Sequence, residues 1–285
     1  MTDDADSDDF VVQLLRENRR LKLELRRLEA IASSRWWRLH PRLNLQRALA
    51  RLRSTHDPPP AAPSPPRPGE SSPIAPSLGD DIGERFRRDV VGRGTFSQDW
   101  FTGHIGPWEP TMAALEGRAA RMLEIGAFEG LSTCYALWRL TDANVTAVDT
   151  FAGSAELRAR NLLPEAPLET IFDANVASVD ASRVRKLVGD SKHVLVDLRA
   201  EGARFDFVYV DGSHLALDVL VDAALSWSLL AIDGFLVFDD YGWSALGVDP
   251  LLGPRAAIEA FLTLVDGKYA VVSEGSQLAL RKTSV

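Results

Sequence analysis

From about residue 120 to the C-terminus, short apolar runs alternate with longer segments whose apolar residues recur at helical spacing. Short apolar runs bounded by polar or turn residues are typical of buried strands, and the longer segments are typical of amphipathic helices. The pattern predicts strands at 121–125, 145–149, 184–189, 205–210 and 234–238.

Helices are expected between these strands, through about residue 140, around 154–162 and 168–178, and over 215–230. The last segment, "YAVVSEGSQLALR", predicts a hairpin that turns at Glu274–Gly275. Such an order predicts an α/β fold, a Rossmann-like doubly wound, mostly parallel seven-stranded sheet with a C-terminal antiparallel hairpin. Ligands of these sheets bind beyond the carboxyl ends of the strands, so the residues that follow each strand are candidates for a site.

The N-terminal part of the chain has a different pattern. Over residues 11–32, apolar residues recur at steps of three and four, and Asn18 stands at a core position. This pattern predicts a short coiled-coil helix that would join copies of the chain into a homo-oligomer, with Asn18 setting the register. A single solvated helix is the alternative.

The segment "SSRWWRLHPRL" follows, with Trp36 and Trp37 among arginines. An aromatic body with a cationic rim suits a lipid headgroup interface, so residues 33–53 are candidates for peripheral membrane contact. A helix that docks onto another protein explains the same residues equally well.

Composition divides the chain into four parts. Residues 1–10 are an acidic tail expected to be disordered, 11–53 a basic arm, 54–79 a proline-rich linker, and 80–285 the folded domain. The net charge of the whole chain is −8 although the arm is basic. The domain is therefore acidic, which argues against nucleic acid as a partner.

Localisation is expected to be cytoplasmic. We find no apolar stretch of membrane-spanning length and no signal-peptide pattern in the sequence. The only cysteine, Cys134, lies in an apolar helical segment, so we expect a buried thiol and no internal disulfide.

Two glycines, Gly126 and Gly130, follow the first predicted strand, where glycine allows a ligand to approach the backbone closely. Their spacing differs from the dinucleotide motif, and Glu124 within the strand favours a cationic ligand over a pyrophosphate. A tight turn without a ligand is the alternative.

The second predicted strand ends in Asp149, at a place where an acid typically binds ribose hydroxyls. Nicotinamide and adenosyl cofactors share that contact. Asp190 and Ser191 follow the third strand and are candidates to meet an adenine edge, although a solvated turn explains them as well.

Three carboxylates follow the fourth and fifth predicted strands. Asp211 ends "YVD", and Asp239 and Asp240 end "LVFDD". Because neighbouring strand ends lie close together, unpaired acids there would raise one another's pKa. A divalent cation such as Mg²⁺ would resolve the repulsion, since it prefers oxygen ligands. Pairing with Arg or Lys side chains, or with helix N-termini, is the alternative.

In this order, "LEIGAFEGLST", "AVD", "GDS", "VDGSH" and "FDDYGW" resemble the strand ends of class I S-adenosylmethionine-dependent methyltransferases. The resemblance covers about residues 95–285, and the lead-in "TFSQDWFTGHIGPWEP" is similar to the active-site cap of bacterial tailoring enzymes. It implies S-adenosylmethionine as cofactor, with the methionine part near the first strand end, the ribose at Asp149 and the adenine near the third strand end. The implied cofactor-binding residues are Glu124, Gly126, Gly130, Ser132, Asp149, Phe151, Asp190 and Ser191.

Metal-dependent catechol O-methyltransferases give a closer comparison, and they imply Asp211, Asp239 and Asp240 as metal ligands. Asp240 replaces the Asn of that family, and His214 stands where the family has its lysine base. Antibiotic-sugar methyltransferases also pair a metal with a histidine, so His214 is the expected catalytic base. Trp100, His104, Tyr241 and Trp243 are candidates for the walls of the substrate pocket, with core or rim packing as the alternative.

The expected function is O-methylation of a hydroxyl on a sugar, glycan or other small natural product, assisted by a divalent cation. The arm resembles N-terminal extensions of bacterial polysaccharide-assembly enzymes, which would place the chain at the inner face of the membrane. Three alternatives stay open: a nicotinamide oxidoreductase, a hydroxylase-like relative on the same fold, and a catalytically silent binding module in a glycan-assembly complex.

Overall fold

The computed structural model describes residues 78–154, 157–158, 160–243 and 253–285. The acidic tail, the coiled-coil arm and nearly all of the proline-rich linker lie outside the described residues, so their structures stay predictions. The helical stretch expected at 154–162 also falls partly outside them.

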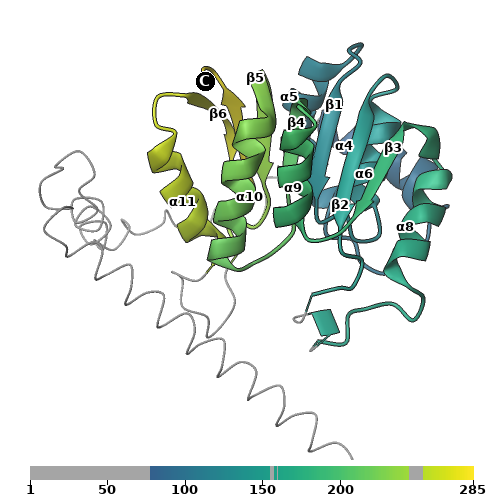
Figure 1. Cartoon of the computed structure of the whole chain (residues 1–285). Helices are drawn as coiled ribbons and strands as arrows, with labels where there is room; N and C mark the ends of the chain where they lie inside the picture. The colour runs from purple at the N-terminus through teal and green to yellow at the C-terminus, as the bar shows by residue number, and fades with distance from the viewer. Residues whose placement is uncertain (1–77, 155–156, 159, 244–252) are drawn as a thin grey trace, which may run out of the picture. The chain divides into compact units, whose positions relative to one another are not determined.

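The described residues contain a single seven-stranded sheet with the strand order β3-β2-β1-β4-β5-β7-β6 (Figure 1). The first five strands are parallel, and β7 pairs antiparallel with both β5 and β6. The strands are β1 (Arg121–Ile125), β2 (Asn144–Asp149), β3 (Val184–Val188), β4 (Phe205–Val210), β5 (Leu230–Phe238), β6 (Tyr269–Glu274) and β7 (Leu278–Lys282).

Helices cover both faces of this sheet (Figure 1). None of the helices in the described part of the chain is long and apolar enough to cross a membrane. The α-helices are α4 (Leu78–Phe86), α5 (Ile105–Leu115), α6 (Leu131–Arg139), α8 (Leu168–Ala177), α9 (Ser191–Ala200), α10 (Ala216–Leu229) and α11 (Pro254–Leu264). Shorter turns of π- or 3₁₀-helix are η2 (Arg87–Val91), η3 (Thr102–His104) and η4 (Ala181–Arg183).

Two hydrophobic cores lie on opposite faces of the sheet, because successive side chains of a strand point to opposite sides. In β4, Phe207 and Tyr209 belong to the core that α4, α5, α6 and α8 share, whereas Val208 and Val210 belong to the core of α9, α10 and α11. A strand buried on both faces reads as an uninterrupted apolar run, which is why "FDFVYV" was recognisable in the sequence.

The strand order reverses between β1 and β4, since β2 and β3 extend the sheet on one side and β5 extends it on the other. In open α/β sheets, ligands bind in the crevice at such a reversal, beyond the carboxyl ends of the strands. The predicted fold class is confirmed, including the parallel strands and the C-terminal antiparallel pair.

One strand differs from its predicted bounds by more than one residue. β5 begins at Leu230, although only 234–238 was expected to be strand. Its pairing with β4 shifts register between Phe205 and Phe207, and Ile232 and Asp233 of the added part are exposed. The irregularity interrupts the apolar run, so the sequence pattern showed only the second half of the strand.

The segment before β1 packs on the sheet, where the sequence predicted a cap. Trp108 of α5 is buried, with its ring 5.0 Å from the ring of Phe207 and 4.8 Å from that of Tyr209. Phe86 of α4 is fully buried against Tyr135 of α6. Cys134 is likewise buried, and burial raises the pKa of its thiol to about 12, which confirms the expectation of an unreactive thiol.

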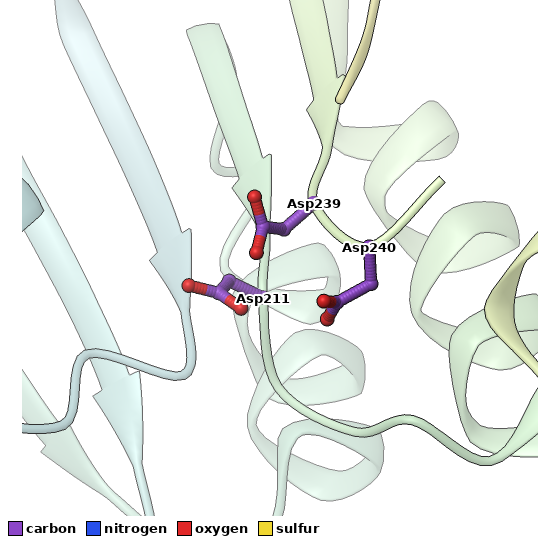
Figure 2. A group of neighbouring side chains, drawn as sticks. All are labelled: Asp211, Asp239 and Asp240. Carbon is purple, nitrogen blue, oxygen red and sulfur yellow. The ribbon is translucent and has the colours of Figure 1, made fainter. Parts of the chain in front are cut away.

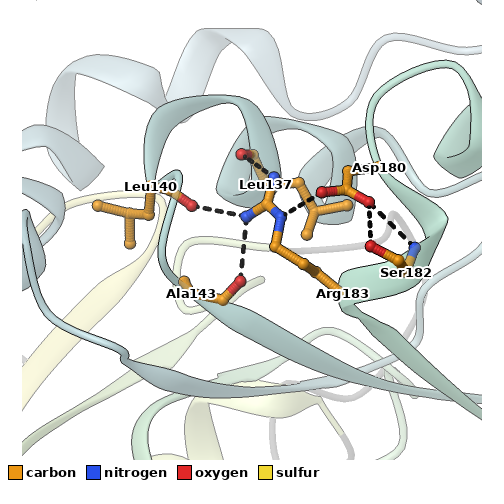
Figure 3. A network of polar contacts seen from close by, with 6 residues as sticks. All are labelled: Leu137, Leu140, Ala143, Asp180, Ser182 and Arg183. Atoms are coloured by element: carbon orange, nitrogen blue, oxygen red, sulfur yellow. Dashed lines mark hydrogen bonds and ion pairs between the residues drawn. The ribbon is translucent and has the colours of Figure 1, made fainter.

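Arg183 closes the C-terminal end of α6 (Figure 3). Its guanidinium donates to the backbone oxygens of Leu137, Leu140 and Ala143 at 2.8–3.0 Å, and to the carboxylate of Asp180 at 2.8 Å. The last carbonyls of a helix have no partner within the helix. A planar cation with five N–H donors can satisfy several of them together, so Arg183 joins α6 to the start of β3.

We expect Arg183→Lys to lower the free energy of unfolding by about 2 kcal/mol, because one ammonium cannot reach all four acceptors. Arg185→Lys is the matched control, since Arg185 forms an exposed pair with Glu201 and should cost less than about 0.5 kcal/mol. Urea denaturation of both variants measures the difference. Equal losses of unfolding free energy in the two variants would show that the contacts of Arg183 at the end of α6 stabilise the fold no more than an exposed ion pair does.

Candidate active site

Three carboxylates meet at the carboxyl ends of two neighbouring strands (Figure 2). Asp211 directly follows β4, and Asp239 and Asp240 directly follow β5. One carboxylate oxygen of each residue lies within 4.8 Å of those of the other two. The structure therefore brings together all three residues that were expected to bind a metal.

Burial and mutual repulsion both disfavour the charged forms of these acids. Burial, together with the charges of Asp239 and Asp240, raises the pKa of Asp211 well above its usual value. Burial and the charge of Asp240 raise the pKa of Asp239. A hard divalent cation favours such a set of oxygen ligands, and its charge would offset the repulsion. The residues present thus fit the implied Mg²⁺, and their binding of it stays a prediction.

Two buried residues that sequence reasoning missed donate hydrogen bonds to this cluster. The Tyr209 hydroxyl donates to Asp211 at 3.1 Å, and the amide nitrogen of Gln277 donates to Asp239. Tyr209 is part of an ordinary apolar strand, and Gln277 stands just after the hairpin turn. Neither position carries a signal in the sequence, because only the packed sheet brings them to the acids.

His214, the expected base, lies beside the third carboxylate. Its Nε2 is 3.0 Å from Oδ2 of Asp240, and its ring stacks on Trp243 with 4.7 Å between the ring centroids. Asp240 has a positive φ of 54°, a conformation that Asp and Asn adopt more readily than most residues. That preference suits a position where the catechol enzymes carry Asn.

Asp149 at the end of β2 organises the loops around the expected ribose site. Its two carboxylate oxygens accept from the backbone N–H groups of Phe128 at 2.8 Å and Phe151 at 2.7 Å. Both phenylalanines have positive φ, 47° and 51°, which is unusual for a bulky residue. Such unusual backbone conformations, here held by the half-buried Asp149, are typical of functional sites. Asp149 retains lone pairs for further donors such as ribose hydroxyls.

Glu124 is buried in β1, and its carboxylate accepts from the hydroxyls of Ser132 and Thr133 at the start of α6. Burial raises the pKa of Glu124 to about 7, while the two hydroxyls act in the opposite direction. Ser132, which was expected to bind the cofactor, thus donates a hydrogen bond to Glu124. Direct contact of either residue with the cofactor stays a prediction.

The structure gives both motif glycines a packing role. Gly126 has a φ of 89°, and a Cβ on it would lie 2.0 Å from the backbone oxygen of Asp211. Gly130 has a φ of 82°, and its Cβ would meet the ring of Phe172 at 2.9 Å. The sequence argument attributed these glycines to close approach of a ligand. The close approach in the structure is that of the protein itself.

The residues expected near adenine stand at the N-terminus of α9. Asp190 accepts from the backbone N–H of Lys192 and so caps the helix. The Ser191 hydroxyl donates at 2.7 Å to Asp222, a buried acid of α10 that the sequence did not single out. Burial raises the pKa of Asp222 to about 6.

The four expected pocket walls have different environments. Trp100 is 51% exposed, and its ring lies 5.3 Å from that of Phe128 in the cofactor loop. His104 is half-buried and lies close enough to Asp239 to interact with it electrostatically, although the surroundings of that acid raise its pKa overall. Tyr241 is buried in the second core with Arg255 over its ring, so its surroundings match the packing alternative. Trp243 stacks on His214 and lies near the acids.

Comparison with known proteins agrees with this geometry. Residues 123–241 match the model of a family described as "Methyltransferase domain", a range that runs from β1 to the residues after β5. A search of curated proteins gave no match.

The chain is similar to several solved structures. The MycE methyltransferase from the mycinamycin biosynthetic pathway, in complex with Mg and SAH, is 16% identical with a TM-score of 0.50; the match covers 74% of this chain and 56% of MycE. Its complex with Mg, SAH and mycinamycin VI gives 19% identity and a TM-score of 0.51, covering 73% and 56%. The O-methyltransferase TomG from Streptomyces achromogenes, in complex with SAM, has 17% identity and a TM-score of 0.48, covering 74% and 92%.

The chain therefore spans little more than half the length of MycE, and at these identities the likeness concerns the fold. The fold and the match over residues 123–241 to a methyltransferase domain agree with the resemblance to class I S-adenosylmethionine-dependent methyltransferases.

We expect Glu124 to make the protein less stable as the pH rises from about 4.5 to 7. Its pKa is raised in the folded state, so over this range the unfolded chain releases a proton that the folded chain retains. The loss amounts to about 3 kcal/mol. Urea denaturation at several pH values should show a flatter profile for Glu124→Gln than for the wild type, and parallel profiles would contradict the assignment.

Gly126→Ala should destabilise the fold by roughly 4 kcal/mol, because it combines backbone strain with a clash against Asp211. Gly117→Ala is the matched control: Gly117 also has positive φ, but a Cβ there meets nothing within 4 Å. This control should lose about 1 kcal/mol from strain alone. Similar losses for the two variants, measured by chemical denaturation, would exclude the proposed contact between strand ends.

Proposed function

We propose that the chain is an S-adenosylmethionine-dependent O-methyltransferase. It would use a divalent cation such as Mg²⁺ to methylate a hydroxyl of a sugar, glycan or other small natural product. The observation that carries the proposal is the meeting of Asp211, Asp239 and Asp240 beside His214. This cluster adjoins β1, whose end carries the cofactor loop.

The cofactor would lie beyond the ends of β1, β2 and β3. Asp149 is placed to accept the ribose hydroxyls, and Glu124, Gly126, Gly130 and Ser132 belong to the loop assigned to the methionine part. Carboxylates in this region suit a ligand that carries a sulfonium and an ammonium group. Phe151, Asp190 and Ser191 complete the cofactor-binding set.

Asp211, Asp239 and Asp240 would hold the cation. When bound, such a cation polarises a hydroxyl oxygen and lowers the pKa of the hydroxyl. Support for this reading comes from the oxygen-only ligand set and from the repulsion that the acids otherwise experience. The MycE structures that share the fold are complexes with Mg.

The reaction is a displacement in which the acceptor oxygen forms a bond to the methyl carbon while the bond from that carbon to sulfur breaks. The sulfur keeps the electron pair, and the acceptor hydroxyl loses its proton. His214 would take that proton, with its ring held by Asp240 and Trp243. The products are the methyl ether, S-adenosylhomocysteine and a proton.

The acceptor would lie between the cation site and the segment before β1. Trp100, His104 and Trp243 offer aromatic faces, which suit both a sugar ring and the methylsulfonium. MycE was crystallised with mycinamycin VI, which supports a small-molecule acceptor without identifying it. A catalytically silent module is not favoured, because the acids and His214 that chemistry requires converge in space.

Residues 11–32 and 33–53 extend the proposal. We infer homo-oligomerisation through the heptads and peripheral contact with the inner face of the membrane through Trp36, Trp37 and their neighbouring arginines. A membrane-bound glycan acceptor would then be within reach of the domain.

Isothermal titration of the full chain tests the function. We expect S-adenosylhomocysteine to bind the wild type and Asp239→Asn with similar affinity, and Mn²⁺, as a probe of the cation site, to bind the wild type only. Asn keeps the shape of Asp but removes the charge that attracts the cation. With an acceptor in hand, Asp239→Asn should lose at least about a hundredfold in turnover.

Asp233→Asn is the matched control, because Asp233 lies on the same strand but is exposed and away from the cluster. It should bind both ligands as the wild type does. Failure of the wild type to bind S-adenosylhomocysteine would overturn the proposal, and equal loss of cofactor and metal binding in Asp239→Asn would remove the metal role.

A further inference from the structure

A buried chain of hydrogen bonds reaches the carboxylate cluster from the C-terminal hairpin. Gln277 immediately precedes β7, and β5 and β7 pair so that Phe238 lies opposite Leu278. The residue after Phe238 is Asp239, and the residue before Leu278 is Gln277. Antiparallel pairing therefore brings these two side chains together, and Gln277 is only 4% exposed.

The direction of these hydrogen bonds is set by Trp108 in the segment before β1. An indole N–H can only donate, and Trp108 Nε1 lies 2.9 Å from Oε1 of Gln277. The amide oxygen of Gln277 is thereby engaged, so its NH₂ group faces the other way. That group donates to Asp239 and, at 3.2 Å, to the hydroxyl oxygen of Tyr209.

Tyr209 extends this hydrogen-bond network to Asp211. Because its oxygen accepts from Gln277, its hydroxyl proton is available for Asp211, whose Oδ2 lies 3.1 Å away. Asp211 and Asp239 thus both receive a donor from one buried network. These donors fix how each carboxylate is turned, and each carboxylate retains further lone pairs for a cation.

We propose that Gln277, oriented by Trp108, is a positioning residue that holds the carboxylates of Asp211 and Asp239 correctly turned for a divalent cation. The inference rests on the proposed function, because it concerns the same cation site. It also gives the segment before β1 a role in metal binding, since Trp108 belongs to α5 and the ligands follow β4 and β5. A shell that fixes the ligands is a general requirement for tight metal sites.

The test compares Mn²⁺ affinity with S-adenosylhomocysteine affinity in the full-length chain. Gln277→Met keeps the length of the side chain but removes its hydrogen bonds. We expect its Kd for Mn²⁺ to rise at least about tenfold, because a hydrogen bond to a charged ligand is lost. The Kd for S-adenosylhomocysteine should stay within about twofold, which a merely structural role would not produce.

Trp108→Phe gives a second route to the same answer, since it removes only the indole donor that orients the amide. We expect about a threefold rise in the Kd for Mn²⁺. Trp138→Phe is the matched control, because Trp138 packs on Phe86 in the same core without a bond to the network. Its affinity for Mn²⁺ should equal that of the wild type.

The outcomes separate the two proposals. Wild-type Mn²⁺ binding with an unchanged Kd in Gln277→Met and Trp108→Phe overturns the positioning role and leaves the proposed function standing. A wild type that binds S-adenosylhomocysteine but no Mn²⁺ removes the cation from the function, and this inference with it. A parallel loss of both ligands in Gln277→Met would reduce Gln277 to a packing residue.

Discussion

Mutual repulsion of the three carboxylates at the ends of β4 and β5 is the constraint on which the rest of the site depends. Burial and this repulsion together raise the pKa of Asp211 well above its usual value. A chain that only had to fold would not place Asp211, Asp239 and Asp240 together, because each acid destabilises the next. The surroundings are arranged to compensate: Tyr209 and Gln277 donate to two of the acids, and His214 lies beside the third. A cation would complete the compensation, and this need is the physical link between stability and function.

The same end of the sheet also holds the cofactor side of the site, and the two sides share backbone. Gly126 directly follows β1 and has no side chain, which lets the backbone oxygen of Asp211 approach where a Cβ would stand. On the other side of β1, Asp149 holds Phe128 and Phe151 in left-handed conformations. The loop between Gly126 and the start of α6 is thus set by contacts with β2 on one side and β4 on the other. The proposed cofactor and cation sites would therefore share the contacts of one loop.

Sequence patterns were sufficient to place a residue in the fold where its position depends on its neighbours along the chain. The apolar run of β4 and the acid that follows it are contiguous, so Asp211 could be assigned to a strand end before the sheet was known. Asp239 and Asp240 follow the same logic. Where a role depends on packing, the sequence left alternatives open: Tyr241 was a candidate for the pocket or a core and lies in a core, and the close approach of Asp211 to Gly126 was not foreseen.

By itself, the sequence determined the alternation of strands and helices, the hairpin at the end, and the acids that terminate the parallel strands. These features follow from the spacing of apolar residues and from the residue types that favour turns, which are both local properties of the sequence. Only the tertiary structure decided that Trp108, Tyr209 and Gln277 form one hydrogen-bonded path to the acids, and that Asp222 lies under Ser191. These contacts join residues far apart in the sequence, and their bonding directions depend on which donors and acceptors packing brings within reach. No local sequence pattern predicts these hydrogen bonds, because they form only when separate helices and strands pack together.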